Sequence, residues 1–324
     1  MHVSPVAMGC WPIAGVTTLG VNAEDSRATV TAALDAGINH FDTAHAYGYR
    51  GESETILGEV LGPLIAAEGR RRVVVATKVG LVWGERRGGG GSGKRPQFKD
   101  GRPETIAAQC EESLSRLHLD AVDLLYLHAP DPKVPLAETA GAMRRLVDAG
   151  KARAAGVSNF TTEQQYRQFA AECPFAADQQ PYNMLQTGIE ADRVFWARRH
   201  GRPKVMIATY WPLMKGLLAG RLTRDHVFAT GDTRQTYTVF QEPEWSKTHE
   251  LLDRLREIAA GLDATLAQLV IAWTIARPAV TAALCGAKRP GQIAETAAAM
   301  RLELPPDVTS QIDQAIAARG PVAA

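Results

Sequence analysis

Eight short apolar segments with a strand-like pattern recur along this chain, and stretches of helical periodicity separate them. Strands that alternate with helices favour a parallel sheet, because each helical crossover returns the chain to the same end of the sheet. Eight such units in one chain predict a closed parallel (α/β)8 TIM barrel rather than an open doubly wound sheet. We expect the strands at residues 3–8, 38–41, 73–76, 122–127, 152–157, 175–178, 205–209 and 280–284.

The helical stretches begin and end with residues that helix termini prefer. Asn22 is a typical N-cap for the first helix, and Gly37 is a typical C-terminal stop for it. Two helical stretches follow the eighth strand, which predicts extra C-terminal helices. After the first helix, we expect further ones near residues 52–64, 102–117, 135–149, from 161 or 162 onward, 188–200, 244–260, 263–276, 290–300 and 306–318.

Length and composition restrict the class of protein to which this chain can belong. The chain has 324 residues, of which 45% are hydrophobic and 22% charged, so it can bury a sizeable core. This length is ordinary for one α/β barrel with insertions, and residues 1–324 are expected to form a single domain. The formal net charge of +1 indicates no nucleic acid and no anionic membrane as a bulk partner.

Cysteine use and the first residues indicate a cytoplasmic location. Cys10, Cys110, Cys173 and Cys285 lie far apart and form no C-x-x-C pair, so we expect small apolar side chains in a reducing compartment. The N-terminus lacks the basic and apolar regions of a secretory signal. No apolar run reaches the roughly 18–20 residues that a membrane helix needs.

Residues 82–101 are rich in glycine and are predicted to form a flexible loop above the barrel mouth. Gly88 to Lys94 fits the pattern G-x-x-x-x-G-K of a phosphate-binding loop. However, Arg95 stands where that motif needs Ser or Thr, and Pro96 follows at once, so we expect no phosphate site. A functional use of the loop would be as a lid.

Titratable residues stand where three predicted strands end: Asp42 and Tyr47 after the second, Lys78 after the third and His128 after the fourth. The C-terminal strand ends of a TIM barrel form its active-site face, so these residues should meet. A lysine ammonium favours the phenolate of a nearby tyrosine and lowers its pKa from about 10. The set could move a proton to or from a carbonyl or hydroxyl oxygen. It contains no good nucleophile and no metal cluster, so it needs a hydride or electron carrier.

The segments around these residues resemble the aldo-keto reductase superfamily, and are most similar to its bacterial general-stress type. The signature is Gly-Ile-Asn-His-Phe-Asp-Thr-Ala-His-Ala-Tyr-Gly at 37–48 with Gly-Glu-Ser-Glu at 51–54. The matches cover almost the whole chain in the order of the superfamily. They include Thr-Lys-Val at 77–79, Asp-Leu-Leu-Tyr-Leu-His at 123–128, Gly-Val-Ser-Asn-Phe at 156–160, Gln179 with Tyr-Asn at 182–183, Tyr-Trp-Pro-Leu at 210–213, Gly-Leu-Leu at 216–218 and Gly-Ala-Lys-Arg at 286–289.

The resemblance implies a TIM barrel that transfers hydride directly from a nicotinamide cofactor, usually NADPH, to a small aldehyde or ketone. Carried over by position, Tyr47 would be the general acid in reduction. Lys78 would lower the pKa of that tyrosine, and Asp42 would hold Lys78. His128 would orient the carbonyl group. No metal ligand is implied.

The resemblance also implies a cofactor site and a substrate pocket. Ser158, Asn159 and Gln179 would hold the carboxamide, and Tyr210 would stack on the nicotinamide ring. Trp11, Trp83 and Trp211 would wall the substrate pocket, and Trp211 could narrow it, because the superfamily commonly has a small residue there. Backbone around Leu213, Gly216 and Leu218 would track the pyrophosphate, and Gly286, Lys288, Arg289, Gln292 and Glu295 would hold the adenosine end.

Two adjacent cations favour NADP over NAD. A 2′-phosphate needs cationic partners, and the arginine fork fits it well. Lys288 and Arg289 stand just after the eighth strand and before the helix that opens at Pro290. The start of a helix adds a favourable field for an anion.

Other functions stay open on the residues alone. One alternative is a non-catalytic NADPH-binding regulator, similar to the barrel subunits that attach to potassium channels. Another is a metal-dependent hydrolase on the same fold, since fold does not fix function. The sequence leaves open the substrate, the preferred reaction direction and the choice between a monomer and a small homo-oligomer.

Overall fold

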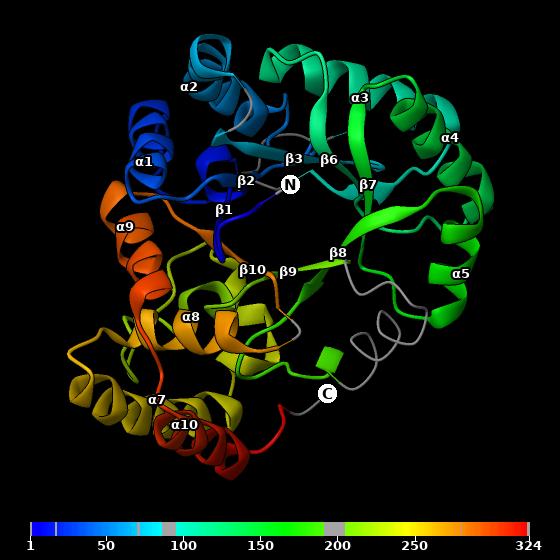
Figure 1. Cartoon of the computed structure of the whole chain (residues 1–324). Coiled ribbons are helices and arrows are strands. Elements are labelled where there is room, and N and C mark those ends of the chain that lie inside the picture. The colour runs from blue at the N-terminus through cyan, green and yellow to red at the C-terminus, as the bar shows by residue number, and fades with distance from the viewer. Residues whose placement is uncertain are drawn as a thin grey trace.

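A closed barrel of parallel strands forms the centre of the molecule (Figure 1). The computed structural model describes residues 2–16, 18–69, 72–85, 95–190, 205–278 and 280–322. The predicted (α/β)8 barrel is confirmed. Each strand pairs with the next barrel strand along the chain, and the last pairs with the first. The barrel strands are β1 (Val6–Gly9), β2 (His40–Asp42), β3 (Val74–Val79), β6 (Val122–Leu127), β7 (Ala152–Ser158), β8 (Phe175–Pro181), β9 (Met206–Tyr210) and β10 (Ala282–Gly286).

Helices surround this barrel, and α7 and α10 pack against each other at the edge of the ring (Figure 1). Asn22 caps the first helix by accepting a hydrogen bond from the backbone N–H of Asp25, as the sequence predicts. Thr162 and Thr265 form capping boxes at later helices. The helices are α1 (Ala23–Asp35), α2 (Glu52–Glu68), α3 (Pro103–Leu117), α4 (Leu136–Asp148), α5 (Glu163–Glu172), α7 (Glu244–Gly261), α8 (Leu266–Ala276), α9 (Pro290–Ala298) and α10 (Pro306–Arg319).

Short 3₁₀ turns complete the described elements, and most of the helix expected at 188–200 lies outside the described residues. In the described part of the chain, no single helix is long and apolar enough to cross a membrane. The pair α7 and α8 reaches that length and composition only across a bend of 89°. The 3₁₀ turns are η1 (Pro12–Ala14), η3 (Met214–Gly216), η4 (Thr233–Thr236), η5 (Thr238–Phe240) and η6 (Ala299–Arg301).

The stretch expected to be a loop at 82–101 contains a small hairpin instead. Strands β4 (Leu81–Trp83) and β5 (Gln97–Lys99) pair antiparallel, with Val82 opposite Phe98. The prediction of a loop is wrong at these two segments, because three residues are too few to show a strand pattern in the sequence. Residues 86–94, and with them the whole of the G-x-x-x-x-G-K pattern at 88–94, lie outside the described residues.

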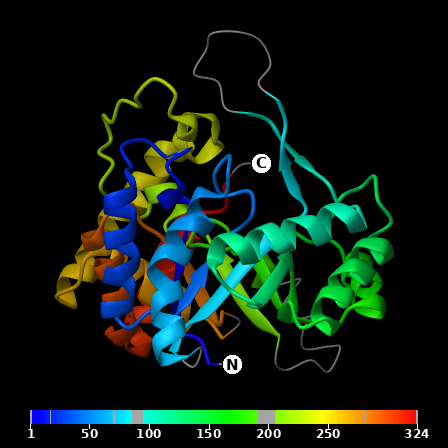
Figure 2. The ribbon, with the colours of Figure 1, turned by 90° about the horizontal axis from the view of Figure 1, so that it is seen from above.

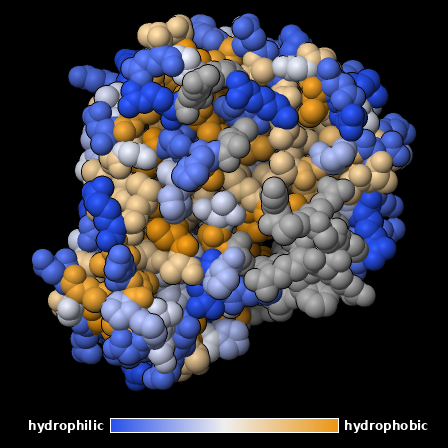
Figure 3. Space-filling model, in the orientation of Figure 1, coloured by the Kyte–Doolittle hydropathy of each residue, from blue (hydrophilic) through white to orange (hydrophobic). Residues whose placement is uncertain are grey.

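The barrel mouth is the side on which the C-terminal ends of the strands lie. Figure 2 shows the β4–β5 hairpin and the segment between β9 and α7 projecting from the side opposite the N-terminus. Because all barrel strands are parallel, their C-terminal ends meet on that side. Figure 3 looks onto the opposite face, where apolar residues show at the centre and polar residues lie mainly around them.

Small side chains line much of the barrel interior, and a few large ones fill it. Ala76, Leu124, Tyr126 and Ala177 form one buried cluster from strands β3, β6 and β8. Tyr126 is opposite Gly156 of β7 in the strand register. A Cβ at Gly156 would lie 2.5 Å from two carbons of the Tyr126 ring. The glycine is therefore required by the space that the tyrosine ring takes up.

We predict that Gly156→Ala lowers the free energy of unfolding by about 1–3 kcal/mol, because a methyl group forced against a buried ring must displace it. Chemical denaturation of the purified protein measures this change. Gly141→Ala is a matched control, since an added Cβ at this position in α4 meets only the end of the Arg145 side chain, at 3.6 Å. It should be neutral or stabilising by roughly 0.5–1 kcal/mol. Equal stability of the Gly156 variant and the wild type would contradict the packing argument.

Candidate active site

A buried ion pair between Asp42 and Lys78 lies where β2 and β3 approach the barrel mouth. Lys78 Nζ donates a short hydrogen bond to Asp42 Oδ1. It donates a second of 2.7 Å to the backbone carbonyl of Thr43 and a third of 3.1 Å to the hydroxyl of Tyr47. The lysine and aspartate side chains are 1% and 2% exposed. All three ammonium N–H groups thus have acceptors, which offsets part of the desolvation of the buried charge.

The electrostatics of this cluster keep Lys78 charged and Tyr47 protonated. Burial works to lower the pKa of Lys78, but the negative charge of Asp42 and the hydrogen bonds to Asp42 and Tyr47 outweigh it and raise that pKa. Burial raises the pKa of the Tyr47 phenol above its ordinary value of 10.0, although the charge of Lys78 acts in the opposite direction. Lys78 does lower the pKa of Tyr47, as expected from the sequence. The net pKa shift is nevertheless upward, because burial of the phenol is the larger effect.

His128 directly follows β6, and its ring contacts that of Tyr47, with 5.8 Å between the centroids. Burial, and then the charge of Lys78, hold the pKa of His128 well below its ordinary value, so its imidazole is neutral. Its Nδ1 is buried and has no hydrogen-bond partner among the described residues. A neutral ring can donate one N–H bond to a substrate oxygen without adding a positive charge beside Lys78.

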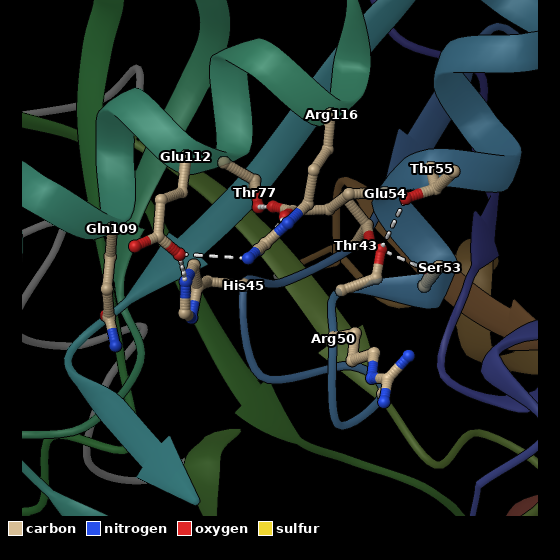
Figure 4. Close-up of polar contacts among 12 residues, drawn as sticks. Thr43, His45, Arg50, Ser53, Glu54, Thr55, Thr77, Gln109, Glu112 and Arg116 are labelled. Carbon is tan, nitrogen blue, oxygen red and sulfur yellow. Dashed lines mark hydrogen bonds and ion pairs between the residues drawn. The ribbon is translucent and has the colours of Figure 1, made fainter.

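A polar network outside the barrel holds the loop that carries Tyr47 (Figure 4). The carboxylate of Glu54, buried in the first turn of α2, accepts a 2.6 Å hydrogen bond from Thr77 Oγ1 of β3. Its other oxygen forms a 3.1 Å ion pair with Arg116 of α3. Because Thr77 precedes Lys78, Glu54 connects the strand of the buried lysine to the helices behind it.

The network continues to His45 on the same loop (Figure 4). Arg116 pairs with Glu112 at 2.9 Å, and Glu112 Oε2 lies 2.8 Å from His45 Nε2. The sequence analysis did not identify this network. The sequence feature that could have indicated the network is the Gly-Glu-Ser-Glu motif at 51–54. This motif supplies Glu54, and its Gly51 leaves room for Arg116. A Cβ on that glycine would lie 2.6 Å from Arg116 Cδ.

Gln179 of β8 belongs to the same buried cluster. Its Nε2 donates a 2.7 Å hydrogen bond to Asp42 Oδ2, the carboxylate oxygen that Lys78 does not use. The backbone carbonyl of Gln179 accepts a 2.9 Å bond from Ser158 Oγ of β7. The structure thus brings Gln179 of the expected carboxamide site against the ion pair, with Ser158 bonded behind it, a contact that the sequence does not reveal.

Asn159 and Tyr210 form a second polar pair at the mouth. Asn159 adopts a left-handed backbone conformation with φ of 59°, which Asn tolerates better than most residues. Its Nδ2 donates a 2.8 Å bond to the backbone carbonyl of His128. Its Oδ1 accepts a 2.8 Å bond from the hydroxyl of Tyr210. Residues at the C-terminal ends of β6, β7 and β9 therefore meet within one hydrogen-bonded group.

The segment after β9 turns tightly next to this assembly. The carbonyl of Leu213 accepts backbone bonds of 2.9 Å from Gly216 and 3.1 Å from Leu218. Gly216 has φ of 92°, which favours glycine. Two cations that the sequence analysis did not identify lie here, Lys215 within the turn and Arg234, whose Nη1 is 3.9 Å from the position of a Cβ on Gly216.

Lys288 and Arg289 stand at the start of α9 and contact the loop between β1 and α1. Lys288 Nζ donates a 3.3 Å bond to the backbone carbonyl of Leu19. Arg289 Nη2 donates a 2.8 Å bond to the carbonyl of Gly20. The two positive charges are therefore side by side and partly exposed at a helix N-terminus, as the sequence predicts.

The other residues of the expected adenosine end lie around this start of α9. Gln292 Oε1 accepts a 2.8 Å bond from the backbone N–H of Lys288. Glu295 forms a 2.6 Å ion pair with Arg221, so its carboxylate is engaged by a neighbouring loop. Gly286 ends β10, where a Cβ would meet Pro12 Cγ at 3.0 Å.

The three tryptophans expected at the pocket occupy different positions. The Trp11 ring meets the Tyr47 ring edge-on, with 4.9 Å between centroids. The Trp83 N–H donates 2.7 Å and 3.1 Å bonds to two backbone carbonyls of the loop that carries Tyr47. Trp211 lies under Lys215, whose Nζ is 3.9 Å from the ring centroid. Trp11 thus borders the acid–base cluster, whereas Trp83 supports its loop.

The polar side chains at the ends of the strands and at the start of α9 are of the kinds that bind a nicotinamide dinucleotide. Amide and hydroxyl groups of Asn159, Ser158 and Gln179 suit a carboxamide. The buried His128 Nδ1 has no hydrogen-bond partner among the residues that the structure describes, so it can bind a further polar atom. Lys288 and Arg289 at a helix start suit a phosphate group.

Comparisons with known proteins find relatives that match most of the chain. The model of the aldo/keto reductase family matches residues 5–317. Aldo-keto reductase YhdN of Bacillus subtilis is 36% identical over 296 residues, covering 90% of this chain and 84% of that protein. The NADH-specific methylglyoxal reductase of Escherichia coli is 31% identical, covering 93% and 91%. The structure of glycerol dehydrogenase AKR11B4 from Gluconobacter oxydans superposes with a TM-score of 0.87 at 34% identity, covering 99% and 94%.

Relatives from Schizosaccharomyces pombe differ in the role that their names state. One is the aldo-keto reductase yakc [NADP(+)], 28% identical over 94% of this chain and 88% of its own length. Another is a putative voltage-gated potassium channel subunit beta, 31% identical over 97% of this chain and 90% of its own length. The relatives therefore include NADH-specific and NADP(+) proteins, and both reductases and channel subunits.

We predict that stability falls with acidification because of His40, which is buried in β2 and whose imidazole has no hydrogen-bond partner in the described part of the chain. Burial lowers the pKa of His40 from 6.5 to about 4, so the unfolded chain binds a proton that the folded protein does not between these pH values. Stability therefore rises with pH in this window, and His40 accounts for a loss of about 2 kcal/mol between pH 7 and pH 5.

Urea denaturation at both pH values measures this loss. The variant His40→Leu should lose about 2 kcal/mol less than the wild type over the same interval. The variant of an exposed histidine, His2→Leu, should behave like the wild type. An identical pH dependence in His40→Leu and the wild type would show that the buried imidazole is not the cause.

Proposed function

The chain belongs to the aldo/keto reductase family, and on that premise we propose that it reduces an aldehyde or ketone to an alcohol, with Tyr47 as the general acid. A nicotinamide cofactor, when bound, supplies the hydride for this reduction. The proposal rests mainly on one observation, the 3.1 Å hydrogen bond from Lys78 Nζ to the Tyr47 hydroxyl within the buried ion pair. The residues of the chain itself act on the proton.

Tyr47 is suited to give a proton to a carbonyl oxygen. Because burial raises its pKa, the phenol stays protonated at neutral pH and is ready to act as an acid. Once the proton has left, the phenolate lies against the Lys78 ammonium, which stabilises the new charge. Asp42 keeps that ammonium charged and in place, so it acts through Lys78 rather than on the substrate.

His128 is suited to orient the carbonyl group. Its ring is neutral and adjoins the Tyr47 ring, so both can reach one substrate oxygen. A neutral donor positions that oxygen without competing with Tyr47 as the source of the proton. Trp11 packs against the other side of Tyr47 and would border the substrate.

We propose NADP(H) as the cofactor, held by the residues expected from the sequence. Asn159, Ser158 and Gln179 would hold the carboxamide, Tyr210 would pack against the ring, and the backbone at 213–218 would follow the pyrophosphate. Lys288 and Arg289 would bind the 2′-phosphate, since an arginine fork and a helix start both favour it. Four free, buried cysteines support a role in the reducing cytoplasm.

A second candidate function is that of a regulatory cofactor-binding subunit, favoured by the similarity to the putative channel subunit of Schizosaccharomyces pombe. The assembled cluster of Asp42, Tyr47, Lys78 and His128 favours catalysis, because a purely binding role has no need for a proton donor. Turnover of a carbonyl substrate separates the two.

We predict that Tyr47→Phe slows carbonyl reduction by roughly 10²–10⁴-fold, the usual contribution of a general acid, because the ring stays and only the proton donor is lost. NADPH oxidation followed by absorbance over a panel of aldehydes, ketones and sugars measures the rate. The affinity for NADPH should stay within a few-fold of the wild type. Tyr49→Phe on the same loop is the control and should keep its activity. Full activity of Tyr47→Phe would refute the assigned role.

We predict that replacing both Lys288 and Arg289 by alanine weakens NADPH binding by about tenfold or more, because two charge-assisted contacts to the 2′-phosphate are lost. NADH lacks that phosphate, so its affinity should change little. Fluorescence titration with each dinucleotide gives the two dissociation constants. Equal losses for both would show that these cations do not recognise the 2′-phosphate.

A further inference from the structure

The carboxylate of Asp25 lies directly beside Arg289, one of the two cations of the proposed phosphate site. Its Oδ2 forms a 3.1 Å ion pair with Arg289 Nη1. The two side chains are 33% and 46% exposed, so the pair is open to solvent and to a ligand. A negative charge therefore stands at the place where the proposed function puts a phosphate.

Asp25 is held in this position by its own helix. It lies in the first turn of α1, where its backbone N–H donates a 2.8 Å bond to the N-cap side chain of Asn22. Asn22 Nδ2 in turn donates a 2.6 Å bond to Asp25 Oδ2. Helices α1 and α9 lie side by side, which keeps the carboxylate and the guanidinium together (Figure 1). The same carboxylate oxygen of Asp25 therefore contacts both Asn22 and Arg289.

Both terminal nitrogens of Arg289 already contact acceptors of the protein. Nη1 also donates a 3.1 Å bond to the backbone carbonyl of Lys288, and Nη2 donates to Gly20. A phosphate that approached the guanidinium would have to share it with the Asp25 carboxylate, and the two anions would repel each other at close range. A ribose 2′-hydroxyl has no such conflict, because it can donate a hydrogen bond to a carboxylate.

We propose that Asp25 is a specificity-determining residue that opposes Arg289 and makes the nucleotide site accept NADH as well as NADPH. The proposal rests on the proposed function, since it concerns the same cofactor site. Arg289 attracts the 2′-phosphate, and Asp25 reduces that attraction and offers an acceptor to the 2′-hydroxyl. The balance of one cation against one anion then sets the selectivity between the two dinucleotides.

The test is Asp25→Asn, which removes the charge and keeps the shape and a side-chain acceptor. Dissociation constants for NADPH, NADH and adenosine 2′,5′-bisphosphate are measured by isothermal titration calorimetry on the full chain. The variant should bind NADPH and the bisphosphate about 3–10-fold more tightly, a modest effect because the pair is exposed. NADH should bind equally or more weakly.

Asp35→Asn is the matched control, because it removes the same charge from the C-terminal end of the same helix. Ten residues along a helix correspond to about 15 Å, beyond one Debye length at physiological salt. This variant should leave all three constants unchanged. Asp25→Ser is a second variant, with a different cap chemistry, in case the asparagine variant folds poorly.

The outcomes separate the two proposals. If Arg289→Ala weakens NADPH selectively while neither Asp25 variant changes the NADPH to NADH ratio, the role of Asp25 is wrong and the proposed cofactor site stands. If the wild type binds neither dinucleotide, the proposed function fails, and the role of Asp25 fails with it. A higher NADPH preference in the Asp25 variants, absent from Asp35→Asn, supports the inference.

Discussion

The buried ion pair of Asp42 and Lys78 is the interaction on which the site depends. Two charges that are almost fully removed from water need their remaining hydrogen-bonding groups satisfied, or the desolvation of each charge is left uncompensated. Here the ammonium binds Asp42, the Thr43 carbonyl and the Tyr47 hydroxyl, and the second carboxylate oxygen accepts from Gln179. One pair thus fixes two neighbouring strands, the loop that carries the phenol and the far side of the barrel.

The surrounding structure supplies what that pair requires. Small residues in the barrel interior allow β3 and β8 to bring Lys78 and Gln179 to one cluster, and the fit of Tyr126 against Gly156 fills the space below. Outside the barrel, Glu54 and Arg116 hold the strand and the loop from behind. In the proposed mechanism, these contacts hold the Tyr47 hydroxyl so that it can donate its proton to a substrate oxygen at the barrel mouth.

The sequence predicts most of this architecture, because strands and helices leave patterns in short stretches of neighbouring residues. Alternating apolar strands and capped helices indicate the barrel, and the strand ends indicate that Asp42, Lys78 and His128 meet, since parallel strands share one end. The hairpin at β4 and β5 escapes prediction because its strands are three residues each and glycines separate them. Contacts such as Gln179 with Asp42 and Asp25 with Arg289 depend on the packing of distant segments, and no local pattern reports them. The net pKa shift of Tyr47 likewise depends on burial, which only the fold determines.

The central claim is that the Asp42–Lys78 pair serves the proton step and not the binding of the cofactor. Single-turnover reduction of a carbonyl substrate by Lys78→Met, with NADPH affinity measured in parallel, tests it most directly. The claim predicts a rate at least about 100-fold below that of the wild type, as for the loss of acid–base assistance, with an NADPH dissociation constant within a few-fold. A near wild-type rate, or a loss of rate explained entirely by a loss of NADPH binding, would contradict it.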